Sequence, residues 1–405
     1  MKPKYSHVIS AAFALLLALG FLIYGTVYAR SLEQKYVHVL APLMLSQSNV
    51  GSALQQAAFQ QPDLLVVYGS SEMLVENTPY RAFQFFQNYP TGFDVYEVAK
   101  GGATSLDIAQ DLAAIGPELR GKKVVFSFTP TMFNAAEVNP LAYAADFSLL
   151  HANALIFNSS LSLQTKQIAA TRMNDYPDTL SSDPVLQFAI QQLDCGCGYG
   201  TYLYDLAVPL GQLDTWVIRL QDHWEVLNYI WSHPKLNPQV VHKPTQIVWA
   251  KQIAQAVTIE KRYSNNNPYG IENQTWIKTY ARVLSVRRKP GSADARFIQN
   301  LNKSKEWTDF ELALRVLKEM GAQPLILSRP MDGPIWNAMG VSSQARHAYY
   351  VKLQNAILPY GFPFVDFANH DSDRFFSVDQ ASHTSREGWV YVDQVLDAFF
   401  HNRIH

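Results

Sequence analysis

A short apolar run in the first quarter of the chain ends in a pair of serines. Residues 64–68 are apolar and include β-branched members, which predicts a strand buried on both faces of a sheet. Gly69, Ser70 and Ser71 follow directly, and small residues at the end of such a strand permit the tight turn that exposes a hydroxyl nucleophile. We predict that Ser71 is this nucleophile, although glycine and serine also cluster in ordinary turns.

An acid and a histidine lie near the other end of the chain, just before an amphipathic segment. Asp379 and His383 precede large apolar residues that share one helical face: Trp389, Val392, Leu396 and Phe399. A serine early in the chain, with Asp and His near its end, is one chain order of Ser–His–Asp hydrolases and acyltransferases. In that chemistry His383 takes the proton of Ser71, and Asp379 orients the imidazole. We predict that folding brings these three residues together.

The elements that must position these residues alternate along the sequence. Apolar runs predict strands at residues 124–128, 324–327 and 364–367. A helix is predicted before the second of these, because four apolar residues share a face and a glycine supplies the C-terminal stop: Trp307, Phe310, Leu314, Leu317 and Gly321. Strands that alternate with helices predict an α/β fold with a mostly parallel sheet covered on both faces.

Active groups of such folds gather at the carboxyl ends of the strands. Gly101, Gly102 and Thr131 follow strand-like runs, as Ser71 does. We predict that the backbone N–H groups of Ser71 and Gly102 stabilise the oxyanion of the reaction, because glycine allows close approach. Gly101 and Ser70 complete the predicted substrate-binding loop, and Thr131 is a further polar donor.

Both ends of the chain resemble one family. Gly69–Ser70–Ser71–Glu72 is similar to the GSSE block, and His383 with Trp389 six residues later is similar to the H-x-x-x-x-G-W block, of the DltD family of D-alanyl transfer proteins. Three intervening segments also resemble this family: residues 99–104, 128–133 and 267–276. The resemblance therefore runs from the N-terminal apolar segment to Phe400.

The acid departs from the family pattern. The family usually carries D-x-x-H, whereas Asp379 lies four positions before His383. A local bulge in a loop absorbs one extra residue without moving either side chain far. Asp371 and Asp373 are the competing acids, and they reach the histidine only if the loop folds back. We predict Asp379 as the acid.

The resemblance implies a fold and an activity. The fold is an SGNH-hydrolase-like three-layer α/β/α arrangement. The activity is that of a membrane-anchored serine acyltransferase or esterase of Gram-positive cell-wall synthesis, which transfers D-alanine to teichoic or lipoteichoic acid through an acyl-Ser71 intermediate. The resemblance also implies that the D-alanyl donor arrives through DltB, DltX and the D-alanyl carrier protein system.

Two other functions stay open at this point. One is an SGNH esterase or O-acetyltransferase that acts on a cell-envelope polysaccharide. The other is a non-catalytic, membrane-tethered module that binds the carrier protein or teichoic acid. Trapping an acyl-Ser71 species would exclude pure binding, and the identity of the acyl group would separate alanyl from acetyl chemistry.

Length and composition are those of a large folded domain. The chain has 405 residues, of which 48% are hydrophobic and 17% charged, and these proportions suffice for a sizeable core. A net charge of −1 gives no basis for binding nucleic acid. The sequence holds no spaced Cys/His set for zinc and no Gly-rich phosphate loop, so we expect no metal and no cofactor. Cys195 and Cys197 are a local disulfide, a redox site or incidental thiols, and we favour a local disulfide or incidental thiols over a redox site.

An N-terminal segment has the properties of a membrane anchor. Residues 8–29 carry no charge, and a helix of that length crosses a hydrocarbon core of roughly 30 Å. Lys2 and Lys4 precede it, which places the N-terminus in the cytoplasm and the rest of the chain outside. A signal peptide cleaved near Ala29 is the alternative, but the apolar run is longer than signal peptides need.

These features predict a division of the chain. Residues 1–30 form the cytoplasmic tip and the anchor, residues 31–61 a stalk, and residues 62–405 an extracellular catalytic domain. Residues 139–290 are rich in Tyr, Trp, Gln and Asn and are predicted to be an insertion beside the site, or else a second domain. Arg287, Arg288 and Lys289 in this segment either contact a polyphosphate chain or form a solvated patch.

The topology can be tested directly. Because the uncharged segment follows two lysines, protease added to intact protoplasts is expected to digest the large domain, as detected with an antibody against its C-terminus. Digestion only after lysis, or a mature soluble protein that begins near Arg30, would contradict an anchor with an outward-facing domain.

Overall fold

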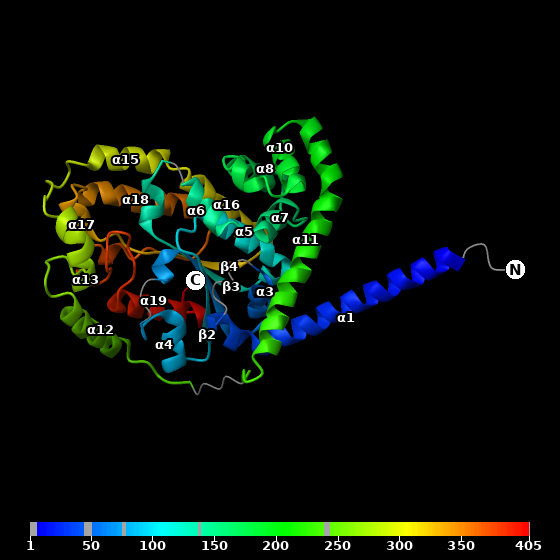
Figure 1. The fold of residues 1–405 in the computed structure, drawn as a ribbon. Helices are drawn as coiled ribbons and strands as arrows, with labels where there is room; N and C mark the ends of the chain where they lie inside the picture. Colours follow the sequence, from blue (N-terminus) through cyan, green and yellow to red (C-terminus); the bar gives the residue numbers. More distant parts are fainter. Residues whose placement is uncertain (1–5, 44–50, 75–77, 137–138, 239–243, 405) are drawn as a thin grey trace.

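The structure, a computed structural model, describes residues 6–43, 51–74, 78–136, 139–238 and 244–404. A five-stranded parallel sheet with strand order β2-β1-β3-β4-β5 lies at its centre (Figure 1). The strands are β1 (Leu64–Gly69), β2 (Asp94–Ala99), β3 (Lys123–Phe128), β4 (Gln323–Ser328) and β5 (Phe364–Val365). Parallel strands direct all their carboxyl ends to one edge, so the segments that follow β1, β2 and β3 meet there.

Helices cover both faces of this sheet. One face carries α3 (Ala53–Gln60), α5 (Ser105–Ile115), α16 (Glu306–Met320) and α18 (Ser343–Ile357). The other carries α4 (Ala82–Asn88) and α19 (Arg386–Phe400). Val66 and Tyr68 of β1 point into the first core, and Leu65 and Val67 into the second, as the two-residue repeat of a strand requires. The predicted α/β fold with helices on both faces of a parallel sheet is confirmed.

The connection from β3 to β4 holds most of the remaining helices. They are α6 (Pro140–Asp146), α7 (Leu149–Ile156), α8 (Leu163–Met173), α9 (Pro177–Leu180), α10 (Pro184–Asp194), α11 (Gly198–Ser232), α12 (Trp249–Tyr263), α13 (Asn273–Thr275), η4 (Trp276–Tyr280), α14 (Ala281–Val283) and α15 (Asp294–Lys303). Side chains from α6, α7, α8 and α10 share one continuous core with β1 and β3. Cys195 and Cys197, just before α11, form a local disulfide. The predicted division at residues 139–290 stays a prediction.

Short helical elements complete the chain. They are η1 (Ser71–Met73), η2 (Gly116–Leu119), η3 (Pro130–Asn134), α17 (Gly333–Ala338), η5 (Leu358–Tyr360) and η6 (Ala368–His370). The predicted strands at residues 124–128 and 324–327 lie within β3 and β4, and α16 ends at Gly321 in the left-handed conformation, with φ 70°. The strand predicted at residues 364–367 is shorter, because Phe367 adopts a φ of 49° that extended chain excludes.

The first helix, α1 (Ser6–Leu43), projects from the folded part of the molecule (Figure 1). Residues 7–28 are largely exposed, whereas Ala29, Val37 and Leu40 are buried against the domain. The segment His7–Ala41 is long and apolar enough to cross a membrane. Lys2 and Lys4, which set the predicted orientation, lie outside the described residues.

Within residues 31–61, where we expected a stalk, the described segments pack on the domain. Leu54, Ala58 and Phe59 of α3 are buried in the core that also contains β1. The side chain of Gln55 is buried too, and it accepts a 2.7 Å hydrogen bond from the hydroxyl of Tyr68 in β1. Polar residues of this segment therefore form hydrogen bonds inside the domain. The mixed composition of the segment did not indicate that it is buried.

Candidate active site

A buried carboxylate fixes the turn that presents Ser71. β1 ends at Gly69, and Ser71 begins η1. The carboxylate of Glu72 is fully buried and accepts the backbone N–H of Ser70 on both oxygens at 3.1 Å, and the hydroxyl of Ser127 at 3.1 Å. A Cβ at Gly69 would collide with Glu72 and Met73, so glycine is required where the strand turns. The turn leaves the side chain of Ser71 partly accessible.

His383 and Asp379 lie in a short hairpin between β5 and α19. Ser377 and Thr384 form an antiparallel bridge, and Ser382 between them takes a left-handed φ of 62°. Nδ1 of His383 lies 2.6 Å from Oδ2 of Asp379, and the backbone N–H of His383 donates to Oδ1 at 3.2 Å. The tight hairpin thus curls the chain so that a four-residue spacing still brings acid and imidazole together.

The same imidazole reaches the serine. Nε2 of His383 lies 2.9 Å from Oγ of Ser71, so the structure joins Ser71, His383 and Asp379 in one chain of hydrogen bonds. A hydroxyl bonded to an imidazole that a carboxylate orients in turn is the arrangement that activates a nucleophile. The histidine and the acid are each about one-sixth exposed, which leaves them close to solvent but largely shielded from it.

The two competing acids are engaged elsewhere. Asp371 forms a two-point ion pair with Arg346, with N–O distances of 2.7 and 2.9 Å. Asp373 accepts from Nδ1 of His370 at 2.6 Å. Neither of these carboxylates bonds to Nδ1 of His383, which is paired with Asp379.

Steric contacts explain why the H-x-x-x-x-G-W block has a glycine at position 388. Gly388 lies in the first turn of α19, and a Cβ there would collide with the carbonyl oxygen of Phe376 and the side chain of Thr384. The hydroxyl of Ser385 caps the helix by accepting the N–H of Gly388 at 3.0 Å. These contacts clamp both ends of the hairpin onto the start of α19 and so fix His383.

Electrostatics favour a charged imidazole in this hairpin. Burial disfavours the imidazolium and by itself would lower the pKa of His383. The hydrogen bond and the charge of Asp379, together with the charge of Glu72, outweigh burial and raise the pKa of His383 above its usual value. Positive charge that develops when the histidine accepts a proton is therefore stabilised.

The loop after β2 lies at the same edge of the sheet. Ser70 is buried, and its hydroxyl donates to the carbonyl oxygen of Lys100 at 3.3 Å, which ties the serine turn to the glycine loop. Gly101 and Gly102 are exposed, and Gly102 has a φ of 93° that favours glycine. Within the part of the chain that the structure describes, the N–H groups of Ser71 and Gly102 have no hydrogen-bond partner. Both donors are thus free to bind an oxyanion.

Thr131 follows β3 in η3 and contacts the hairpin of His383. Its hydroxyl lies 2.9 Å from that of Thr129 and donates to the carbonyl oxygen of Ala381 at 3.4 Å. In this conformation the hydroxyl of Thr131 supports the hairpin and is not a free donor.

Two cations near the site, the largely buried Lys100 and the fully buried Arg329, were missed in the sequence. Lys100 directly precedes the glycine pair; its ammonium donates to the carbonyl oxygen of Asp146 at 2.9 Å and lies 3.7 Å from Asp111. Arg329 directly follows β4, and its guanidinium carbon lies 5.2 Å from the centre of the Trp389 ring. One feature of the sequence could have identified them: each is a charged residue directly after an apolar strand. A charge buried there without a partner is costly, so its presence indicates a specific role.

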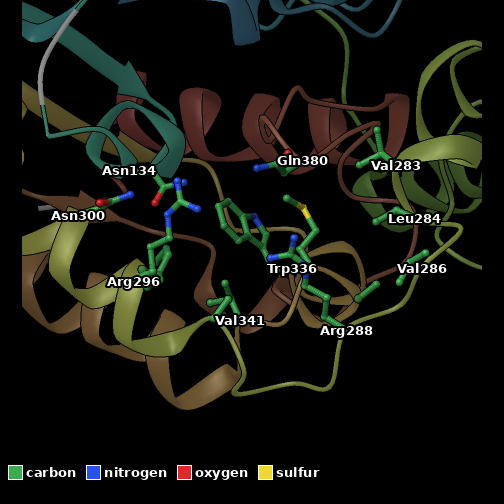
Figure 2. A pocket seen from close by; sticks show the side chains of 14 residues that line it. Asn134, Val283, Leu284, Val286, Arg288, Arg296, Asn300, Trp336, Val341 and Gln380 are labelled. Atoms are coloured by element: carbon green, nitrogen blue, oxygen red, sulfur yellow. The ribbon is translucent and has the colours of Figure 1, made fainter.

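A cavity of about 350 Å³ opens on the other side of the hairpin (Figure 2). Its wall includes Gln380, the residue after Asp379, together with Asn134 at the end of η3. The backbone N–H of Gln380 donates to the hydroxyl of Tyr280 at 3.2 Å, which fixes this side of the hairpin to η4. Residues of the segment 283–288, within the predicted insertion, therefore line a hollow beside the hairpin of the predicted catalytic residues. Among the described residues, we find no cluster of three His, Cys, Asp or Glu side chains that could hold a metal ion.

The chain is similar to proteins of one family. The sequence profile of a family described as "DltD protein" matches residues 41–401. The chain belongs to the DltD family. Protein DltD of Bacillus subtilis (strain 168) is 27% identical over 350 residues, which cover 86% of this chain and 86% of the relative. Protein DltD of Staphylococcus aureus (strain NCTC 8325 / PS 47) is 23% identical over 348 residues, 85% of this chain and 83% of the relative.

The DltD match includes the residues of the hydrogen-bonded chain and most of the fold around them. It begins at residue 41, after the exposed part of α1, and ends within one residue of the end of α19. The resemblance predicted from the GSSE and H-x-x-x-x-G-W blocks is confirmed. The catalytic roles of Ser71, His383 and Asp379 stay predictions.

The role of the acid can be tested through pH dependence. A histidine that acts as a base must be neutral, so activity is expected to fall as the pH drops through its raised pKa. Asp379→Asn removes the interactions that raise this pKa, so the acid limb of the kcat/KM profile should move to lower pH. Loss of the carboxylate should also lower turnover by about 10⁴. Hydrolysis of an activated ester between pH 4 and 9 measures both effects.

Asp373→Asn is the matched control, because it removes a nearby carboxylate that bonds to a different histidine. This variant should keep the activity and the pH profile of the wild type. An inactive Asp373→Asn protein beside a nearly normal Asp379→Asn protein would show that the acid is misassigned.

Proposed function

We propose that this DltD-family protein acts in the D-alanylation of teichoic acid as a membrane-anchored serine acyltransferase. The observation that carries the proposal is the unbroken chain of hydrogen bonds from Ser71 through His383 to Asp379. A pure binding module has no need for a hydroxyl aligned on an oriented imidazole, so this geometry favours covalent chemistry.

The reaction would proceed in two balanced steps. His383 accepts the proton of Ser71 while Oγ bonds to the carbonyl carbon of the D-alanyl donor, and Asp379 stabilises the imidazolium. The bond to the leaving group then breaks, and His383 returns its proton to that group, which leaves D-alanyl-Ser71. In the second step His383 takes the proton of an acceptor hydroxyl, the new ester forms, and the proton returns to Ser71.

Stabilisation of the tetrahedral intermediates would come from the backbone. The unpartnered N–H groups of Ser71 and Gly102 are the donors that we assign to the oxyanion. Removing one such donor from other enzymes costs about 10²–10³ in rate. Ser70 holds this loop in place, since its hydroxyl ties the carbonyl of Lys100 to the serine turn, and Gly101 belongs to the same loop.

The setting of the reaction follows from the family and from α1. The acceptor is teichoic or lipoteichoic acid, and D-alanine reaches the protein through DltB, DltX and the carrier protein system. We infer that α1 anchors the chain in the membrane and that the domain faces outward, because the segment His7–Ala41 has the length and hydropathy of a span. The chemistry uses side chains and backbone alone, with no cofactor.

An esterase or O-acetyltransferase would use the same three residues, so the acyl group and its fate decide between these functions. Ser71→Ala removes the nucleophile without disturbing β1, so the protein should fold with an unchanged Tm. Cells with only this variant should lose D-alanyl esters on teichoic acid, as measured by alkaline release of D-alanine. Intact mass spectrometry of the wild type with donor should show one D-alanyl group on Ser71.

Each departure from this result has its own meaning. Normal D-alanylation in cells with Ser71→Ala would refute the proposal. A rise in D-alanyl esters would identify a removing esterase instead, and an acetyl adduct on Ser71 would identify an O-acetyltransferase.

A further inference from the structure

We propose that the cavity beside the His383 hairpin binds a phosphodiester group of the acceptor chain. The proposal rests on the proposed function and deepens it, because it assigns the acceptor to one place in the fold. Side chains from four separate parts of the chain converge there: Asn134, Arg288, Arg296, Asn300, Trp336 and Gln380. In Figure 2 the Trp336 indole lies between Arg296 on one side and Arg288 on the other.

The charge of the cavity fits an anion. Arg288 and Arg296 both line it, and among the described residues neither guanidinium forms an ion pair with a carboxylate. None of the described lining residues is acidic. Two guanidinium groups without an acidic counterpart leave the cavity positive although the chain as a whole has a net charge of −1. The planar fork of donors on arginine matches the oxygens of a phosphate.

Most of the remaining lining is apolar, and its polar part fits the polyol that links the phosphates. Asn134, Asn300 and Gln380 supply amides that can both donate to and accept from hydroxyl groups. Trp336 supplies an apolar face for the carbon chain. A polyanion with free hydroxyls between its phosphates therefore matches this wall better than a neutral polysaccharide does.

The place of the cavity explains why an acceptor would bind there. Gln380 is the neighbour of Asp379, so the wall of the cavity and the hydrogen-bonded chain to Ser71 belong to the same hairpin. A phosphate held at the arginines keeps the same polymer beside the hairpin that carries His383 and Asp379. Positioning of this kind accelerates the second step without changing the first.

The experiment separates the two steps in full-length protein, with a polyglycerol-phosphate teichoic acid as the probe. Arg288→Ala and Arg296→Ala should each raise the KM for this acceptor by about tenfold, because each removes one charged contact to phosphate. The rate at which the donor forms D-alanyl-Ser71 should not change. Arg287→Ala is the matched control, since Arg287 has the same charge but does not line the cavity and packs 5.6 Å from the centre of the Tyr269 ring.

The outcomes are distinguishable. Normal acceptor KM values for Arg288→Ala and Arg296→Ala, with D-alanyl-Ser71 still formed, would overturn the cavity as the acceptor site and leave the proposed function intact. An equal effect of Arg287→Ala would overturn it too, because general attraction to the polyanion would then suffice. Absence of D-alanyl-Ser71 in the wild type would overturn the proposed function itself.

A different observation supports a second inference: we infer that the outer face of α11 lies in the surface of the membrane that α1 crosses. This helix carries a stripe of large, exposed apolar side chains: Leu206, Leu210, Leu213, Val217, Trp224 and Trp231. At 3.6 residues per turn, these positions fall within about 60° of one another. The exposed charged residues of α11, Asp205 and Glu225, lie about 100° to either side.

The stripe has no cover within the described chain, although the opposite face of α11 is buried in the domain. Tyr204, Val226 and Ile230 on that face pack into the core, so α11 is apolar on both sides. A soluble protein seldom exposes a long apolar stripe, and tryptophan on such a stripe is typical of the interface between lipid and water.

The short distance between α11 and the anchor helix α1 indicates that the lipid surface covers the apolar stripe. Nδ1 of His223 in α11 lies 2.7 Å from Glu33 of α1, only four residues beyond Ala29, where α1 enters the folded domain. Four helical residues rise about 6 Å, which is within the depth of a headgroup layer. Figure 1 shows α11 on the side of the molecule from which α1 extends. A membrane crossed by the exposed part of α1 would therefore meet the outer face of α11.

Tryptophan fluorescence tests this arrangement in full-length protein. Three of the eight tryptophans lie on α11, at Trp216, Trp224 and Trp231, and α1 has none. In phosphatidylcholine vesicles with brominated acyl chains, the wild type should be quenched relative to unbrominated vesicles. The triple variant W216F/W224F/W231F should lose most of this quenching, and the control Trp276→Phe, outside α11, should retain it.

Equal fractional quenching of the wild type and the triple variant would overturn the inference, as would a wild type that is not quenched at all. Flotation with the vesicles reports insertion of α1 separately. A protein that floats without quenching would place α11 away from lipid. A protein that does not float would refute both the anchor and the membrane-bound helix.

Discussion

The 2.9 Å hydrogen bond between Ser71 and His383 is the contact on which the rest of the structure depends. It joins residues that are 312 positions apart. The bond can form only if the fold places the end of β1 and the start of α19 at the same edge of the sheet. The buried apolar side chains of α19 share one core with Leu65 and Val67 of β1, which holds the helix on that face of the sheet. The hairpin then needs only a few local contacts to aim the imidazole.

Some of the local contacts at the serine turn are made by buried charged side chains. Glu72 accepts three hydrogen bonds beneath the serine turn, and Arg329 is buried nearby, where burial lowers the pKa of its guanidinium to about 10 while the charge of Glu72 opposes that shift. Asp393 and Glu97 also oppose the shift, so several buried carboxylates share the compensation of this one buried cation. The hydrogen bonds of Glu72 hold the turn in one geometry, and the proposed catalysis depends on fixed geometry.

The sequence predicted those parts of the fold whose signals are local. Apolar runs marked β1, β3 and β4, and Gly321 marked the end of α16. β2 carried no clear strand signal because its buried Glu97 faces Arg81, at 2.6 Å, and this pairing is invisible before folding. The proximity of Asp379 to His383 was predictable, but the hairpin with Ser382 at positive φ that makes the spacing work was not. The cavity could not be predicted, since Asn134 and Gln380 are distant in the sequence and meet only through tertiary structure.

Under the proposed function, the choice between transfer and hydrolysis would depend on this tertiary assembly. A tether to the membrane raises the local concentration of the acceptor. It does not exclude water, which reaches any partly exposed acyl-serine. Orientation contributes far more, because well-aligned groups react with effective molarities of about 10⁵–10⁸ M. A polymer held by phosphate contacts next to the hairpin gains that advantage, and a free water molecule does not. If the cavity binds the acceptor as proposed, the segment that supplies Arg288 to its wall is the part of the fold that would turn an esterase-like site into a transferase.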